Sequence, residues 1–333
     1  MWDVDNQTPY AAEATWDRSK DGVPEWIVAV KGTFEIRADG EAVLAEKQLE
    51  PLIQAEYNGE DGVSSLRYDA DLVGQKPTTD IIVNGTAYSP GGRPSNDFSI
   101  GLQIGPLRKL VRVRGNRWWK ENGEQCSSPE PVTQVPLVYE RAYGGYDHVD
   151  PDPKNHSLDP RNPVGCGRVA DRRHRAGKML PNFEYPDGDL EKAGPAGFGA
   201  IDTFWSPRRE FWGTYDGDWE RDRKPLLAAD WDPRSRLCSP PDQQPKSHLH
   251  GGDLVELLNL TPDGRWTFRL PRVHLRFTTQ IRNRSEEHRG QLSTIVIEPD
   301  HKRVLLVWLT SLPCPIDVDY LEETKVRVKK ELT

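Results

Sequence analysis

Alternation of apolar and polar residues is the clearest pattern along the chain. Within residues 26–37, Val28, Val30, Phe34 and Ile36 share one face, and mainly polar side chains occupy the other. A period of two is typical of a β-strand with one buried face. The same pattern in the N-terminal part predicts further strands at residues 81–88, 99–104 and 109–114. Glycine, proline and asparagine separate these segments, which favours antiparallel connections.

Strand patterns return near the C-terminus, where the candidates are residues 254–260, 266–277 and 292–298. The sequence Glu298-Pro299-Asp300 then predicts a turn, and residues 303–310 run back as the second strand of a hairpin. Residues 325–329 alternate and carry lysines, so this pattern predicts an exposed edge strand that its charges protect from further pairing.

The middle of the chain differs from both ends in its composition and in its lack of a regular pattern. Residues 144–240 contain 11 proline, 11 glycine and 11 arginine residues and no helical stripe, yet four tryptophans argue against disorder. We therefore expect residues 144–250 to form an ordered, loop-rich belt that packs on the two strand regions. The predicted fold class is mainly β, with antiparallel strands around the belt and few short helices. The expected organisation is one large domain over residues 1–333, with sub-regions 1–143, 144–250 and 251–333.

Charge, apolar stretches and cysteine spacing limit the partners and the cellular location that we expect. The net charge of −8 argues against nucleic acid as the main partner. The N-terminus lacks the basic start and apolar segment of a signal peptide, and the longest apolar stretch, residues 304–309, is too short to cross a bilayer. Four widely spaced cysteines suggest reduced thiols. We expect a cytoplasmic bacterial protein without a membrane partner.

Motifs for enzymatic chemistry are weak. His248 and His250 lie two residues apart without a third ligand at a suitable spacing, and no nucleotide-binding or hydrolase motif occurs, so we expect no metal and no cofactor. The main enzymatic alternative is a hydrolase of cell-wall glycan or peptide that uses paired carboxylates. The candidate pairs are Glu140 with Asp147 and Asp216 with Asp218.

Arginine and aromatic residues recur in short motifs across residues 117–219, and they allow two interpretations. Arginine forks bind backbone carbonyls and carboxylates and stack on aromatic rings, which would hold irregular loops in place. The same residue types are also common interface anchors. The candidate partner-binding residues are Trp119, Tyr143, Arg161, Trp205, Arg208, Tyr215 and Trp219. Burial of these side chains would favour the structural interpretation.

Several of these motifs also carry a family resemblance. They include Val30-Lys31-Gly32-Thr33-Phe34, Lys76-Pro77-x-x-Asp80, Tyr139-Glu140-Arg141-Ala142-Tyr143-Gly144-Gly145, Arg161-Asn162-Pro163-Val164-Gly165, Trp205-x-Pro207-Arg208 and Gly213-Thr214-Tyr215. Over about residues 5–275 the chain resembles a domain-of-unknown-function family of type VI secretion effector adaptors or chaperones. That family is encoded beside VgrG, PAAR and Rhs-type effector genes and is distinct from the Tap-type and Eag-type adaptors. Gly32 replaces an expected alanine, and Tyr143 an expected phenylalanine.

The resemblance implies a non-enzymatic adaptor. Such a protein would bind a cognate effector in the producing cell, through the effector's PAAR or N-terminal region, and promote its loading onto the VgrG–PAAR spike. VgrG itself is a second candidate partner. The resemblance assigns no role to any individual residue of this chain. Two alternatives stay open beside it: the carboxylate-dependent hydrolase, and a structural spike component, which would form a symmetric oligomer.

Overall fold

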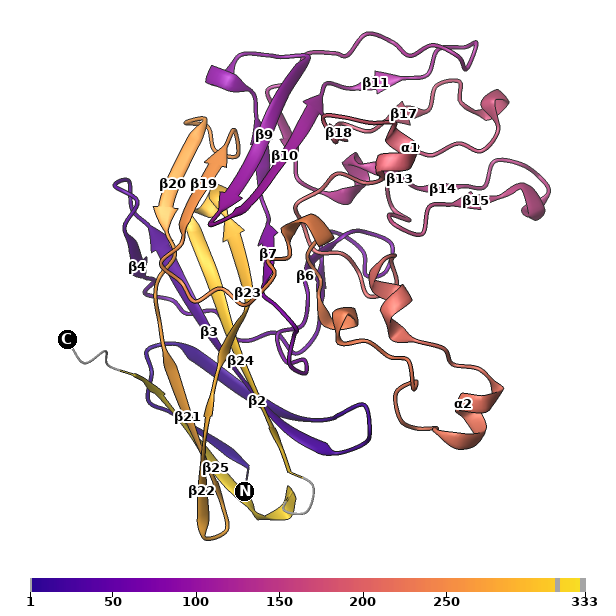
Figure 1. The fold of residues 1–333 in the computed structure, drawn as a ribbon. Coiled ribbons are helices and arrows are strands. Elements are labelled where there is room, and N and C mark those ends of the chain that lie inside the picture. The colour runs from indigo at the N-terminus through magenta and orange to yellow at the C-terminus, as the bar shows by residue number, and fades with distance from the viewer. Residues whose placement is uncertain (1, 315–317, 330–333) are drawn as a thin grey trace.

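Three β-sheets organise the chain (Figure 1). The structure is a computed structural model that describes residues 2–314 and 318–329. The largest sheet has the order β2-β3-β24-β23-β7, with β4 alongside β3. Its strands are β2 (Ala11–Arg18), β3 (Pro24–Ile36), β4 (Ala42–Leu44), β7 (Asp80–Val83), β23 (Gln291–Glu298) and β24 (Arg303–Pro313).

Two smaller sheets flank the first one. The five-stranded sheet has the order β18 (Phe183–Glu184), β10 (Leu107–Arg114), β9 (Asp97–Ile104), β19 (Leu254–Leu258), β20 (Arg265–Arg269). The four-stranded sheet has the order β1 (Asp3–Asn6), β25 (Leu321–Val328), β21 (Leu275–Ile281), β22 (Arg284–Arg289). In these three sheets most neighbouring strands are antiparallel, whereas β1 with β25 and β23 with β7 are parallel.

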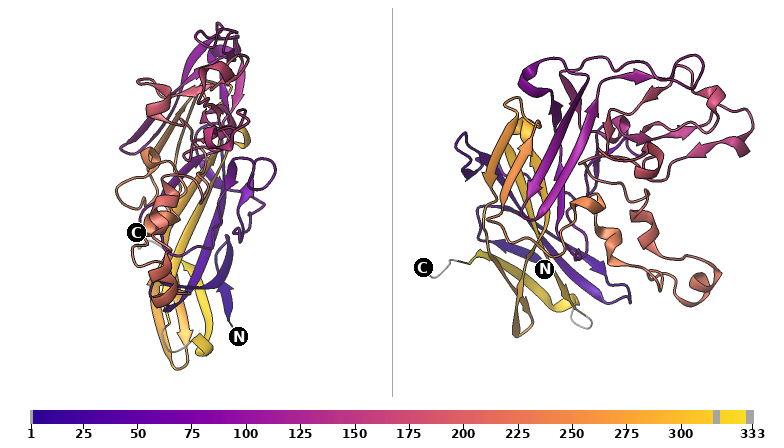
Figure 2. Two further views of the ribbon diagram at one scale, coloured as in Figure 1. Left: turned by 90° about the vertical axis from the view of Figure 1, so that its right-hand side faces the viewer. Right: turned by 45° about the horizontal axis from the view of Figure 1, so that its top comes forward.

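Short elements build the rest of the chain, including the belt, which projects to one side of the sheets (Figures 1 and 2). The short strand pairs are β5 (Glu56–Tyr57) with β6 (Leu66–Tyr68), β8 (Thr86–Tyr88) with β12 (Gln134–Pro136), β11 (Arg117–Trp118) with β17 (Met179–Leu180), β13 (Tyr143–Gly144) with β16 (Cys166–Gly167), and β14 (Tyr146–Asp147) with β15 (Ser157–Leu158). The α-helices are α1 (Leu190–Ala193) and α2 (Gly217–Asp222). Single 3-10 turns cover Pro90–Gly92, Tyr139–Arg141, Pro153–Asn155, Arg172–His174, Arg208–Trp212, Pro233–Arg236, Pro241–Gln243, Pro299–His301 and Val318–Tyr320.

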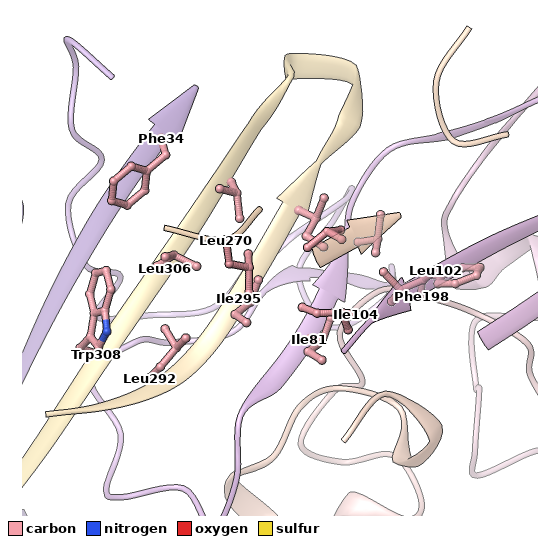
Figure 3. Packing of buried hydrophobic residues seen from close by; sticks show 14 of the residues in the cluster. Phe34, Ile81, Leu102, Ile104, Phe198, Leu270, Leu292, Ile295, Leu306 and Trp308 are labelled. Atoms are coloured by element: carbon pink, nitrogen blue, oxygen red, sulfur yellow. The ribbon is translucent and has the colours of Figure 1, made fainter. Parts of the chain in front are cut away.

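One hydrophobic cluster runs through the molecule. Phe34 and Trp308 contribute to it from the six-stranded sheet, Ile104 from the five-stranded sheet and Phe277 from the four-stranded sheet. Phe198 of the belt is buried in the same cluster, beside Ile104 in the view of Figure 3. Burial of these apolar surfaces is the main force that holds the sheets and the belt together.

The mainly β fold class is confirmed, and most predicted strands are present. The hairpin after Glu298 is confirmed, because β23 and β24 pair antiparallel. The segment 81–88 is divided, since β7 ends at Val83 and β8 begins at Thr86. The segment 266–277 is also divided, between β20 and β21 of different sheets, and Pro271, which cannot donate to a strand ladder, lies between them.

The prediction that β3 is half-buried is wrong. Lys31 and Thr33 on its polar face are buried, as are Ile27 and Ala29. The residues 48–73 cover this face, and Lys31 Nζ binds a carboxylate oxygen of Asp71 at 2.8 Å. A strand pattern records which side chains are polar, but a polar side chain is buried when a partner satisfies it.

The prediction of an edge strand at residues 325–329 is also wrong. Strand β25 lies inside the four-stranded sheet, paired in parallel with β1 and antiparallel with β21. Thr324 and Val326 are fully buried. The face that carries Lys325 is partly exposed, but both edges of the strand are occupied.

Candidate functional site

Three of the seven residues proposed from the sequence are buried. The Trp205 ring meets the Tyr139 ring edge-on, with ring centroids 5.5 Å apart, and Tyr143 is 6% exposed. The Arg208 guanidinium lies 2.6 Å from the Asp69 carboxylate and donates to the carbonyls of Ser235 and Ile201. These side chains hold the belt against the core through their contacts.

Trp119 and Arg161 are partly buried within irregular chain. The Arg175 guanidinium stacks on the Trp119 ring, 4.9 Å from its centroid. Arg161 binds the Asp159 carboxylate at 2.7 Å and donates to the carbonyl of Glu191. These contacts are local, and they match the structural interpretation of the arginine and aromatic motifs.

Tyr215 and Trp219 form a pair at helix α2. Their ring centroids lie 4.9 Å apart, Tyr215 is exposed, and the Trp219 indole donates to the carbonyl of Leu226. Asp216 caps the helix by accepting hydrogen bonds from the backbone of Asp218 and Trp219. The seven candidates therefore do not share one exposed surface, and partner binding by Tyr215 and Trp219 stays a prediction.

Buried charge pairs join the belt to the sheets. Lys76 Nζ lies 2.7 Å from Asp80, and both side chains are buried. Asp80 also accepts hydrogen bonds from Ser239 and from the backbone of Cys238. Burial alone would raise the pKa of Asp80, but Lys76 and these hydrogen bonds hold it below its usual range. Both residues belong to the Lys-Pro-x-x-Asp motif of the family resemblance, but the motif alone did not predict that they form a buried pair.

Lys109 is another buried cation. Its ammonium group donates to the Gly197 carbonyl and lies 2.7 Å from the Asp242 carboxylate. Tyr185 donates to the other Asp242 oxygen at 3.0 Å. Burial lowers the pKa of Lys109 to about 8, although Asp242 acts in the opposite direction. The sequence carries no sign of this buried residue, because Lys109 lies in a strand whose apolar and polar residues alternate in the ordinary way.

The carboxylates considered for hydrolysis have hydrogen-bond or ion-pair partners within the protein. Glu140 accepts hydrogen bonds from the backbone and the hydroxyl of Ser65, and Asp147 accepts one from the backbone of Ala170. Asp216 caps α2, and the nearby Asp218 binds Arg221 at 2.8 Å. Each of the four side chains therefore has a structural role in these interactions.

The described residues offer few other centres for chemistry. Within residues 2–314 and 318–329, no group of three or more His, Cys, Asp or Glu side chains could hold a metal ion. The His248 ring donates from Nδ1 to the carbonyl of Leu292, at 3.2 Å. In the same ranges no helix is long and apolar enough to cross a membrane.

The outer face of the five-stranded sheet carries a surface that sequence reasoning missed. Strand pairing places Leu110, Gly101, Leu258 and Arg265 side by side across β10, β9, β19 and β20. Leu110 and Leu258 are 46% and 38% exposed. Between them Gly101 leaves a depression of about 380 Å³, with Arg108 at its rim. We call this surface the leucine depression.

Gly101 determines the shape of the leucine depression. A Cβ atom at this position would lie 3.4 Å from the Leu110 side chain and 3.7 Å from Leu258. Any side chain here would therefore fill the space between the two leucines. Glycine weakens a strand interior, and it often marks a place where another molecule approaches the sheet closely. The surface is apolar at its centre and charged at its rim, as in many protein interfaces.

Comparison with known proteins places the chain in a family. No curated protein and no solved structure matches it. Residues 21–309 match the family described as "Uncharacterized protein conserved in bacteria (DUF2169)". This match spans most of the chain, including all strands of the leucine depression and the whole belt. The chain belongs to the DUF2169 family of bacterial proteins.

Proposed function

We propose that this protein is a non-enzymatic adaptor that binds a partner protein through the leucine depression. The supporting observation is the row of Leu110, Gly101 and Leu258 on an open sheet face. Large aliphatic side chains exposed together mark protein-interaction sites more often than catalytic sites. A partner side chain placed over Gly101 would remove both leucines from water, and Arg108 and Arg265 would supply the polar rim.

The resemblance described above gives the partner its identity in this proposal. The partner is a cognate type VI secretion effector, bound through its PAAR or N-terminal region, and the adaptor promotes its loading onto the VgrG–PAAR spike. This process takes place in the bacterial cytoplasm before secretion. A direct contact with VgrG belongs to the same proposal, because loading must bring the effector and the spike together.

The first test is co-purification of the full chain with the effector encoded beside its gene. Leu110→Lys and Leu258→Lys should each weaken binding at least about tenfold, because a charge replaces the apolar contact. Gly101→Val should do the same by filling the depression. Leu44→Lys is the matched control, since Leu44 is a strand leucine with a similar exposure of 43% outside this surface.

The second test is secretion by the producing cell. Deletion of this gene should abolish delivery of the cognate effector while other effectors are still delivered. If the leucine variants fold and bind as well as Leu44→Lys, the assignment of the depression fails. If delivery continues without the gene, the adaptor function fails, and if all secretion stops, the protein is a structural part of the machine.

A further inference from the structure

A second cavity lies where the four-stranded sheet meets the six-stranded sheet. It encloses about 980 Å³ between the chain at 247–250, the end of β21, the end of β22 and Trp308. Gly290, which connects β22 to β23, also lines this cavity. We call it the arginine groove, because of the charges described next.

Three arginines lie side by side across the four-stranded sheet, and two of them line the arginine groove. Strand register places Arg327 of β25 opposite Arg276 of β21, and Arg276 opposite Arg289 of β22. Cross-strand partners point to the same face, about 5 Å apart at Cβ. All three side chains are exposed, and Arg276 and Arg289 line the groove together with Lys329.

This row lacks matching negative charge. Within residues 2–314 and 318–329, the ion pair found for the row joins Arg276 to Glu287, at 3.3 Å, and Glu287 is the acidic side chain of the groove lining. Further along the same face, Lys325 is paired with Glu323 at 2.7 Å. Like charges placed directly opposite one another destabilise a sheet. The arginine row therefore destabilises this part of the sheet, and a bound anion would reduce the repulsion between the arginines.

The groove also offers backbone to an incoming chain. Strand β22 is the last strand of its sheet and pairs with β21 alone in the described sheet. Its residues 287–289 reach the groove lining. An extended segment can therefore add to this edge through main-chain hydrogen bonds while its side chains meet the arginines.

We infer that the arginine groove binds an extended acidic segment of a partner protein. The whole chain carries a charge of −8, so a duplex or single strand of nucleic acid, with its dense phosphates, is repelled by most of the surface. A short acidic peptide meets only the local positive field. The inference rests on the adaptor function, and it adds the chemistry of a second contact that is separate from the leucine depression.

The test measures binding of a fluorescently labelled synthetic peptide of glutamate and serine to the full chain by anisotropy. We expect saturable binding that weakens with added salt, because exposed charges are screened. Arg276→Glu combined with Arg289→Glu should weaken binding at least about tenfold. Arg93→Glu is the control, because Arg93 is an exposed arginine in a loop outside the groove. A lysine and serine peptide should not bind.

Three results would overturn the inference. They are no binding of the acidic peptide, an equal loss with Arg93→Glu, and equally tight binding of a single-stranded DNA of the same charge. The Leu110→Lys variant separates this inference from the adaptor function, since it should still bind the peptide. If the effector co-purifies with the protein but the peptide never binds, the groove assignment alone is wrong.

Discussion

Lys76 and Asp80 illustrate how single residues hold irregular chain on a sheet. The pair is buried. Asp80 also accepts hydrogen bonds from the backbone of Cys238 and from Ser239, both in the belt. Arg208 with Asp69 repeats this arrangement, whereas Lys109 is buried and its partner Asp242 is partly exposed. Buried pairs contribute little net stability relative to apolar residues, but loss of one partner leaves an uncompensated charge.

This arrangement predicts a large effect for Lys76→Met. The variant should lower the free energy of unfolding by about 3–5 kcal/mol, because Asp80 stays buried without its counter-charge. Lys224→Met is the matched control, since Lys224 also pairs with an acid four positions away, Glu220, but on the surface. It should change stability by less than about 1 kcal/mol. Urea unfolding measures both, and similar effects would contradict the assigned role.

At the scale of elements, a buried polar network joins two sheets. The His288 ring of β22 bridges the hydroxyls of Thr279 in β21, at 2.7 Å, and Thr310 in β24, at 2.6 Å. Thr279 continues to Thr324 of β25, which accepts a hydrogen bond from the Trp26 indole of β3. A neutral imidazole has one donor and one acceptor, which suits this bridging position.

This network predicts a pH dependence of stability. Burial lowers the pKa of His288 to about 4, from 6.5. Between these values the unfolded chain binds the proton and the folded chain does not, so stability falls as pH drops from 6.5 toward 4, by at most about 3 kcal/mol. His288→Gln should be less stable at pH 7.5 but should show a flatter profile over this range. Equal slopes for both proteins in urea unfolding would contradict the prediction.

At the scale of the molecule, the shared core bears on domain organisation. Phe34, Ile104, Phe198 and Phe277 belong to one cluster although they come from all three large sheets and the belt. One domain over the whole chain stays a prediction, and this continuity is a reason to expect it, because parts that share a core lose their stability together. The belt has little regular structure of its own, so it depends on that core.

One cooperative transition is therefore expected in denaturant. Tryptophan fluorescence reports the belt and the sheets, and far-ultraviolet circular dichroism reports the strands. The two curves should coincide, with the same midpoint. Limited proteolysis should likewise leave the belt intact under native conditions. Two separated transitions, or early loss of the belt with the strands still folded, would contradict a single domain.

The local pattern was sufficient to predict most strands, the hairpin at Pro299 and an ordered belt, because side-chain alternation and turn residues act over a few positions. It could not predict the neighbours of β25, since β1 joins it from about 320 positions away. The burial of Lys31 and Lys109 and the row of Leu110, Gly101 and Leu258 were hidden for the same reason. Register between distant strands decides which side chains meet, and that register is a property of the folded chain alone.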